Sequence, residues 1–141
     1  MKYVLDASVA FKWFVPEVNS DKAIVLRDDF RNAIHELIAP KFFPVECTHS
    51  ITRAERQGRI TQAQGLQALA DLLAMLPDLH SVLPLLPRAY EISSSMRVGV
   101  YDCIYVGLAE RENCELVTGD DKLVKTLQPM FPFIIPLSSM P

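Results

Sequence analysis

The chain has 141 residues, half of them hydrophobic, with a formal net charge of −3 and an isoelectric point near 5.6. This length suits a single domain over residues 1–141. Such a domain has a hydrophobic core large enough to be stable without disulfide bonds or a structural metal ion. The negative charge argues against a protein that binds nucleic acid through bulk positive charge, although it leaves room for a local basic patch.

The cysteines and the apolar runs indicate the cellular compartment of the protein. Cys47, Cys103 and Cys114 show neither disulfide-framework nor zinc-site spacing, so we expect buried thiols in a reducing compartment. At the start of the chain, Asp6 follows only three apolar residues, so no signal-peptide core is expected. No run approaches the roughly 20 apolar residues of a membrane span. The sequence therefore predicts a soluble, cytoplasmic protein without a membrane segment.

Short apolar runs alternate with amphipathic segments along the chain. The apolar runs predict strands over residues 2–5, 37–40, 114–120 and 133–137, with an edge strand around Val82. Apolar spacing and capping patterns predict helices over residues 7–14, 21–33, 41–57, 62–75, 88–96, 98–111 and 121–127. Strands that alternate with helices are typical of an α/β protein, so we predict an α/β sandwich on a mainly parallel sheet.

Four carboxylates far apart in sequence are expected at one edge of this sheet. Asp6 and Asp120 directly follow predicted strands, and the carboxyl ends of parallel strands meet at one edge. Asp102 and Glu46 lie near the starts of predicted helices, which begin at that same edge because crossover helices run antiparallel to the strands. Each aspartate alone would also suit an ordinary helix N-cap, and Glu46 alone would suit a solvated helix position.

Convergence of these acids points to a particular chemistry. Carboxylates within a few ångströms repel one another, so the site needs either a proton or a cation. Carboxylate oxygens with nearby water are the ligands that Mg²⁺ or Mn²⁺ prefers. Such an ion supports phosphodiester hydrolysis without a nucleophilic serine or cysteine, which fits the absence of a GxSxG pattern from the chain.

Four motifs resemble those of the PIN-domain nucleases in order and spacing. They read LDASVAFKWFVPE, PKFFPVE, YDCIYVGLAE and LVTGDDKL, and together they span nearly the whole chain. The resemblance is to the VapC-type toxins of prokaryotic toxin–antitoxin pairs in particular. It implies a three-layer, PIN-like α/β/α sandwich and a Mg²⁺- or Mn²⁺-dependent endoribonuclease. It also implies a homodimer that is inhibited by a cognate VapB-type antitoxin.

The resemblance also implies roles for individual residues. By their motif positions, the catalytic and metal-binding acids are Asp6, Glu46, Asp102 and Asp120. Ser8 and Thr118 match hydroxyl positions that orient a carboxylate or a metal-bound water, although ordinary capping and strand packing would explain them equally well. Asp121 is an alternative to Asp120 because the two are adjacent, but the motif spacing favours Asp120.

Arginines continue along the predicted helix that carries Glu46. Arg53 lies two helical turns beyond Glu46 on the same face, and Arg56 and Arg59 follow at three-residue steps. We predict that Lys12, Arg53 and Arg56 contact RNA phosphates or acidic antitoxin residues, with a solvated helix end as the ordinary explanation for any single arginine.

Four leucines repeat at helical spacing over residues 66–76. This stripe is typical of a core-facing side, and it also suits a dimer face or an antitoxin groove. His49, one turn after Glu46, is interpreted as an incidental polar residue.

Two alternatives to the toxin function stay open: a catalytically weak PIN-like protein that acts through a partner, and a housekeeping RNA-processing nuclease. The presence of all four acids counts against the first, and the short chain counts against the second.

Overall fold

A five-stranded sheet forms the centre of the computed structural model, which describes residues 1–141. Its strands are β1 (Lys2–Leu5), β2 (Glu36–Pro40), β3 (Asp78–His80), β4 (Glu115–Thr118) and β5 (Ile134–Pro136). Every neighbouring pair is parallel, and the order across the sheet is β3-β2-β1-β4-β5. The predicted parallel sheet is confirmed.

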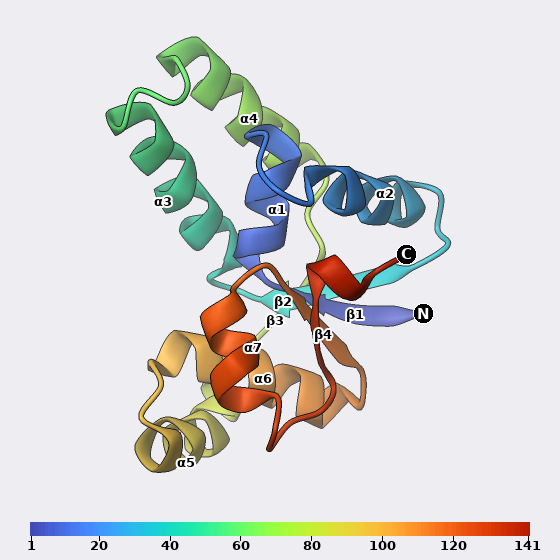
Figure 1. Cartoon of the computed structure of the whole chain (residues 1–141), viewed down its shortest axis with the longest axis vertical. Helices are drawn as coiled ribbons and strands as arrows, with labels where there is room; N and C mark the ends of the chain where they lie inside the picture. Colours follow the sequence, from blue (N-terminus) through green and yellow to red (C-terminus); the bar gives the residue numbers. More distant parts are fainter.

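Helices cover both faces of the sheet. They are α1 (Ala7–Phe14), α2 (Ser20–Arg31), α3 (Phe43–Arg56), α4 (Gln62–Ala74), α5 (Leu86–Met96), α6 (Val100–Glu112) and α7 (Asp121–Leu127). Two short 3₁₀ helices are η1 (Leu83–Leu85) and η2 (Leu137–Ser139). Figure 1 shows α1 to α4 on one side of the sheet and α5 to α7 on the other. The predicted α/β/α sandwich is therefore confirmed.

The most buried helix is α6, which packs against the three central strands. Every residue from Cys103 to Ala109 is buried, so this helix is apolar all round. The central strands are also apolar on both faces because helices cover each of them. Asp102 lies one residue before this buried run, at the end of α6 that reaches the carboxyl edge of the sheet.

The edge strand lies earlier in the chain than predicted. β3 covers Asp78–His80 and pairs with β2, whereas Val82 directly precedes η1. Pro84 lacks the N–H that strand pairing needs, and its fixed φ suits the first turn of a helix. The chain therefore turns into a helical conformation at Val82, and α5 begins at Leu86 rather than at residue 88.

Only part of the predicted leucine stripe is covered: Leu76, just after α4, packs against the core, and Leu69 is half-buried. Leu66 is 62% exposed and Leu73 is 53% exposed, whereas the buried side of the helix carries Gly65, Ala68 and Leu72. A side chain at Gly65 would begin 3.5 Å from a methyl group of α3, so the small residues let α4 approach α3 closely. The core-facing interpretation therefore holds for Leu76 and is wrong for Leu66 and Leu73, whose apolar surface is left for other contacts.

All three cysteines are free, as predicted. Cys47 and Cys103 are buried, and burial followed by the charge of Asp102 raises the pKa of the Cys103 thiol to about 11, which keeps it protonated. None of the helices combines the length and the hydrophobicity that crossing a membrane requires.

Candidate active site

The four predicted acids line one cleft at the carboxyl edge of the sheet. Asp6 follows β1 and Asp120 follows β4, and these two strands are neighbours. Asp102 and Glu46 lie in the first turns of α6 and α3. All four side chains line a cleft of about 480 Å³, here called the acid cleft. The topology thus brings together residues that are up to 114 positions apart.

One wall of the acid cleft is apolar and aromatic. Tyr101 is 58% exposed, and the edge of its ring meets the ring of Phe42 with centroids 5.0 Å apart. Val45, which is 69% exposed, continues this wall. His49, interpreted from the sequence as an incidental polar residue, also lines the cleft. The cleft therefore combines carboxylates with a flat apolar surface.

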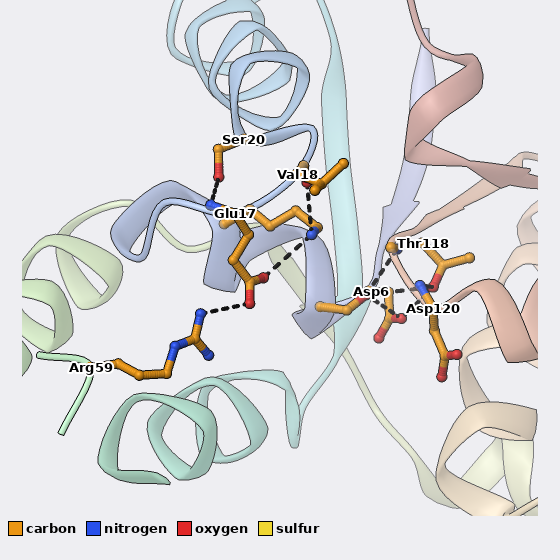
Figure 2. Close-up of polar contacts among 10 residues, drawn as sticks. Asp6, Glu17, Val18, Ser20, Arg59, Thr118 and Asp120 are labelled. Carbon is orange, nitrogen blue, oxygen red and sulfur yellow. Dashed lines mark hydrogen bonds and ion pairs between the residues drawn. The ribbon is translucent and has the colours of Figure 1, made fainter. Parts of the chain in front are cut away.

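Two hydroxyl groups hold the carboxylate of Asp6. Ser8 Oγ donates a hydrogen bond of 2.8 Å to Asp6 Oδ2, and Thr118 Oγ1 donates one of 2.6 Å to the same oxygen. Asp6 is 7% exposed and Thr118 is fully buried, so this contact belongs to the packed interior (Figure 2). Asp6 Oδ1 accepts no hydrogen bond from the protein and is left for a ligand.

The same hydroxyl groups hold the loop after β4. Gly119 N donates to Ser8 Oγ at 2.9 Å, and Asp120 N donates to Thr118 Oγ1 at 3.1 Å. This fixes the backbone of Asp120 relative to Asp6 across two neighbouring strands. Asp121 is the first residue of α7 and does not line the acid cleft, so Asp120 is the acid of this motif in the cleft.

Capping accounts for only one of the three aspartates. Asp120 Oδ1 accepts hydrogen bonds from Lys122 N at 3.0 Å and Leu123 N at 3.2 Å, as an N-cap does. Asp6 precedes α1 without a side-chain capping bond. Asp102 lies inside the first turn of α6, whose N-cap is a glycine. The positions of Asp6 and Asp102 are therefore not explained by helix capping.

Glu46 is held by a tyrosine from another helix. Tyr105 Oη donates a hydrogen bond of 2.7 Å to Glu46 Oε1, and Tyr105 itself is 1% exposed. This partner of Glu46 was not predicted from the sequence. A signal for it was present, because Tyr105 lies three residues after Asp102 and therefore on the same side of α6.

Each of the four carboxylates keeps at least one oxygen without a protein donor. These oxygens are Asp6 Oδ1, Glu46 Oε2, Asp120 Oδ2 and both oxygens of Asp102. As the side chains stand, no three His, Cys, Asp or Glu groups are gathered tightly enough to hold one ion by themselves. Mg²⁺ commonly takes one or two carboxylates and completes its shell with water and substrate phosphate. The donor set fits that manner of binding.

The shared negative charge raises the pKa values in the cleft. Burial, and then the charges of Asp6, Asp120 and Glu46, raise the pKa of Asp102 to about 6. Burial also raises the pKa of Asp6, opposed by its two hydroxyl donors. For Glu46, burial raises the pKa and the Tyr105 hydrogen bond lowers it. A cation bound at these oxygens would therefore compete with protons.

We expect the Tyr105→Phe substitution to weaken divalent-ion binding by roughly tenfold, because the oriented oxygen of Glu46 loses its donor. The measurement is the Mn²⁺ concentration that half-saturates the rise in melting temperature. Tyr90→Phe is the matched control, since Tyr90 is 72% exposed on α5 and outside the cleft. An unchanged Mn²⁺ requirement in Tyr105→Phe would show that the hydrogen bond has no part in ion binding.

The predicted basic residues differ in their surroundings. Arg53 lines a second cleft of about 410 Å³, which shares Ser8 and Ser50 with the acid cleft. Arg56 lies one turn further along α3, lines neither cleft, and is 3.5 Å from Thr52 Oγ1. The structure thus brings Arg53 close to the acids and leaves Arg56 outside.

Lys12 and Arg59 line the same cleft as Arg53 but are tied to one carboxylate. Lys12 Nζ lies 3.3 Å from Glu17 Oε1, and Arg59 Nη2 lies 2.8 Å from Glu17 Oε2 (Figure 2). The stem of Lys12 crosses Gly119, where a Cβ would come within 2.9 Å of Lys12 Cε. In this arrangement Glu17 compensates the charge of both cations.

Comparison with known proteins agrees with this architecture. The PIN domain model matches residues 3–126. The chain is 29% identical to ribonuclease VapC9 of Mycobacterium tuberculosis over 132 residues, which cover 94% of this chain and 96% of the relative. The residues that the family model matches include Asp6, Glu46, Asp102 and Asp120.

Two solved structures share the fold. The crystal structure of PAE2754 from Pyrobaculum aerophilum superposes with a TM-score of 0.70 at 21% identity and covers 99% of this chain and 94% of that one. VapBC2 from Rickettsia felis, bound to a DNA fragment from its promoter, gives a TM-score of 0.66 at 15% identity with coverage of 96% and 97%. With the PIN domain matched over most of its length, the chain belongs to the PIN-domain family.

Proposed function

We propose that this protein is a Mg²⁺- or Mn²⁺-dependent endoribonuclease, the VapC-type toxin of a toxin–antitoxin pair. The observation that carries the proposal is the acid cleft, where four elements each contribute a carboxylate with a free oxygen. The similarity to a VapC ribonuclease over nearly the whole chain supports RNA as the substrate. The presence of all four acids weighs against a binding protein without activity.

The chain positions its carboxylates before any substrate arrives. Ser8 and Thr118 hold one oxygen of Asp6 and direct the other into the cleft. The tyrosine on α6 and the backbone of α7 do the same for the acids on α3 and after β4. We infer that Asp6, Glu46, Asp102 and Asp120 hold the divalent ion. When bound there, Mg²⁺ or Mn²⁺ supplies positive charge beside the scissile phosphate and lowers the pKa of the attacking water.

The cleft beside the acids is suited to the RNA backbone. Arg53 lines it, and Arg53 has no acidic partner within the protein, so its charge is available to a phosphate. Lys12 serves the same phosphate once Glu17 releases it. Arg56 remains a predicted contact for RNA or antitoxin further along α3.

For partners, we propose a VapB-type antitoxin and a second copy of the chain. A protein named VapBC2 shares the fold, which supports an antitoxin partner for this chain. The exposed leucines of α4, Leu66 and Leu73, lie two turns apart on one side of the helix and offer apolar surface of the kind that protein interfaces bury. Their side chains are the ones to change to lysine in tests of dimerisation and of antitoxin binding.

Expression in a bacterial host tests the toxin function. We expect induction of the unmodified chain to arrest growth, because RNA hydrolysis in the cell stops translation. The Asp6→Asn variant should grow normally while still binding its antitoxin, since its surface outside the cleft is unchanged. Growth arrest that persists in the Asp6→Asn strain at equal protein level would contradict toxicity through this site.

A further inference from the structure

A second basic cleft lies on the other side of the acids. It has a volume of about 330 Å³ and includes Asp102 and Asp120 in its lining, so it opens directly onto the acid cleft. Its cations are Arg97, which ends α5, and Lys122 in the first turn of α7. None of the motifs that resemble the PIN nucleases includes Arg97.

The cations beside the acids make no ion pair within the protein. Of 14 lysines and arginines, those without an acidic group within 4.0 Å are Lys22, Arg31, Lys41, Arg53, Arg56, Arg97, Lys122 and Lys125. Three of them line clefts that adjoin the acids: Arg53 on one side, Arg97 and Lys122 on the other. All three are exposed.

The backbone at Arg97 supports a role for its side chain. Arg97 adopts a left-handed conformation with φ 55°, which glycine or asparagine adopts more easily than arginine. The loop that follows is fixed by a 2.6 Å hydrogen bond from Ser93 Oγ to the carbonyl of Val98. The guanidinium is therefore carried by an ordered turn beside the acids rather than by a free loop.

The two basic clefts that flank the acid cleft carry the charge that a bound nucleic-acid strand needs. An acid cleft repels phosphates, so a strand that crosses it needs cations on both sides of the scissile bond. An unpaired cation binds a phosphate without first breaking an ion pair, whereas Lys12 and Arg59 must leave Glu17. The unpaired cations lie on both sides of the acids, as such a path requires.

We propose that an RNA strand crosses the acid cleft with one flanking phosphate at Arg53 and the next, on the other side of the scissile bond, at Arg97 and Lys122. The proposal rests on the nuclease function proposed above and deepens it by assigning the strand's path. The Arg97–Lys122 cleft is then a phosphate subsite in which Lys122 comes from the last motif and Arg97 lies outside all four motifs.

Salt dependence of RNA binding tests this path. The probe is a labelled single-stranded RNA of about 12 nucleotides, and all proteins carry Asp102→Asn so that the probe is not cut. The test variant combines Arg97→Asn, which suits the left-handed backbone, with Lys122→Gln; a second variant is Arg53→Gln. The control is Lys125→Gln, an unpaired lysine on α7 that lines neither basic cleft.

Each lost phosphate contact should reduce the slope of log affinity against log salt by about 0.7. Because Arg97 and Lys122 share one phosphate, the Arg97→Asn/Lys122→Gln variant should lose about 0.7 of slope and bind a few-fold more weakly at physiological salt, and Arg53→Gln should also lose about 0.7. The control should match its parent. In chains that keep Asp102, the same substitutions should raise KM and leave kcat within about twofold, because uniform substrate binding is what they remove.

The outcomes separate the path from the function. An unchanged slope in the Arg97→Asn/Lys122→Gln variant, with a parent that binds RNA, would overturn the path and leave the nuclease proposal standing. An equal loss of slope in Lys125→Gln would also overturn it, because the effect would then be one of net charge. A parent that binds no RNA at any salt concentration would overturn the path and the proposed function together.

Discussion

Substitution of Asp102 by asparagine is expected to lower RNA cleavage by at least about 100-fold, because loss of a partner that only orients a metal ligand already costs 10- to 100-fold. Asp102 lies in the acid cleft with both oxygens free of protein donors. The side chain caps no helix and makes no hydrogen bond that folding needs, so the variant should fold normally. Initial rates on a labelled RNA at saturating Mn²⁺ measure the effect.

Asp121→Asn is the matched control for this substitution. It also removes one carboxylate charge near the site, but Asp121 begins α7 and lies outside the acid cleft. Its cleavage rate should stay within a few-fold of the unmodified chain. Full activity in Asp102→Asn, or a large loss in Asp121→Asn instead, would contradict the assignment of the acids.

The second large effect is a coupling among protons, divalent ions and stability. Asp102 has a pKa of about 6 in the folded protein against an ordinary value of 3.8, so the folded state binds more protons between these values. In EDTA, the contribution of Asp102 to stability is therefore complete below about pH 4 and is lost as the pH rises through 6. The melting temperature of the unmodified chain should fall relative to that of Asp102→Asn over this range.

Addition of Mn²⁺ at pH 7 should reverse the loss. Ion at 100 times its dissociation constant stabilises a folded protein by about 2.7 kcal/mol. For a chain of this size that corresponds to a rise in melting temperature of roughly 5–10 °C. Asp102→Asn should show a much smaller rise, and the rise in the unmodified chain should weaken as the pH falls below 6. Equal rises in both proteins would place the ion elsewhere.

Topology explains why the acid cleft could be predicted from the sequence. Asp6 and Asp120 each follow a short apolar run, and the rule that parallel strands end at one edge brings them together without any knowledge of side-chain packing. Asp102 could be placed at the same edge because crossover helices begin there. The fold class followed from the same alternation of strands and helices, and it is confirmed.

Contacts between distant helix faces could not be predicted in the same way. The hydrogen bond from Tyr105 to Glu46 joins residues 59 positions apart and depends on how α6 passes α3. Arg59 appeared to extend the arginine ridge, but Gly58, with φ 74°, ends the helix and turns Arg59 toward Glu17. Periodicity describes one helix at a time, whereas both contacts depend on the angle between elements.

The side of α4 that is buried was also not predictable from the sequence. The leucines at 66 and 73 have the spacing of a core face, but small residues at Gly65 and Ala68 allow a closer approach to α3 on a different side of α4. Close packing selected that side over the more hydrophobic one. The apolar stripe was identified correctly from the sequence, but the exposure of Leu66 and Leu73 was not.

The most direct test of the central claim is cleavage of a mixed panel of structured RNAs by the purified chain in Mg²⁺, in Mn²⁺ and in EDTA, beside Asp102→Asn purified in parallel. We expect endonucleolytic products in either metal and none in EDTA or with the variant. Cleavage that persists in EDTA and in the variant alike would contradict hydrolysis at the acid cleft.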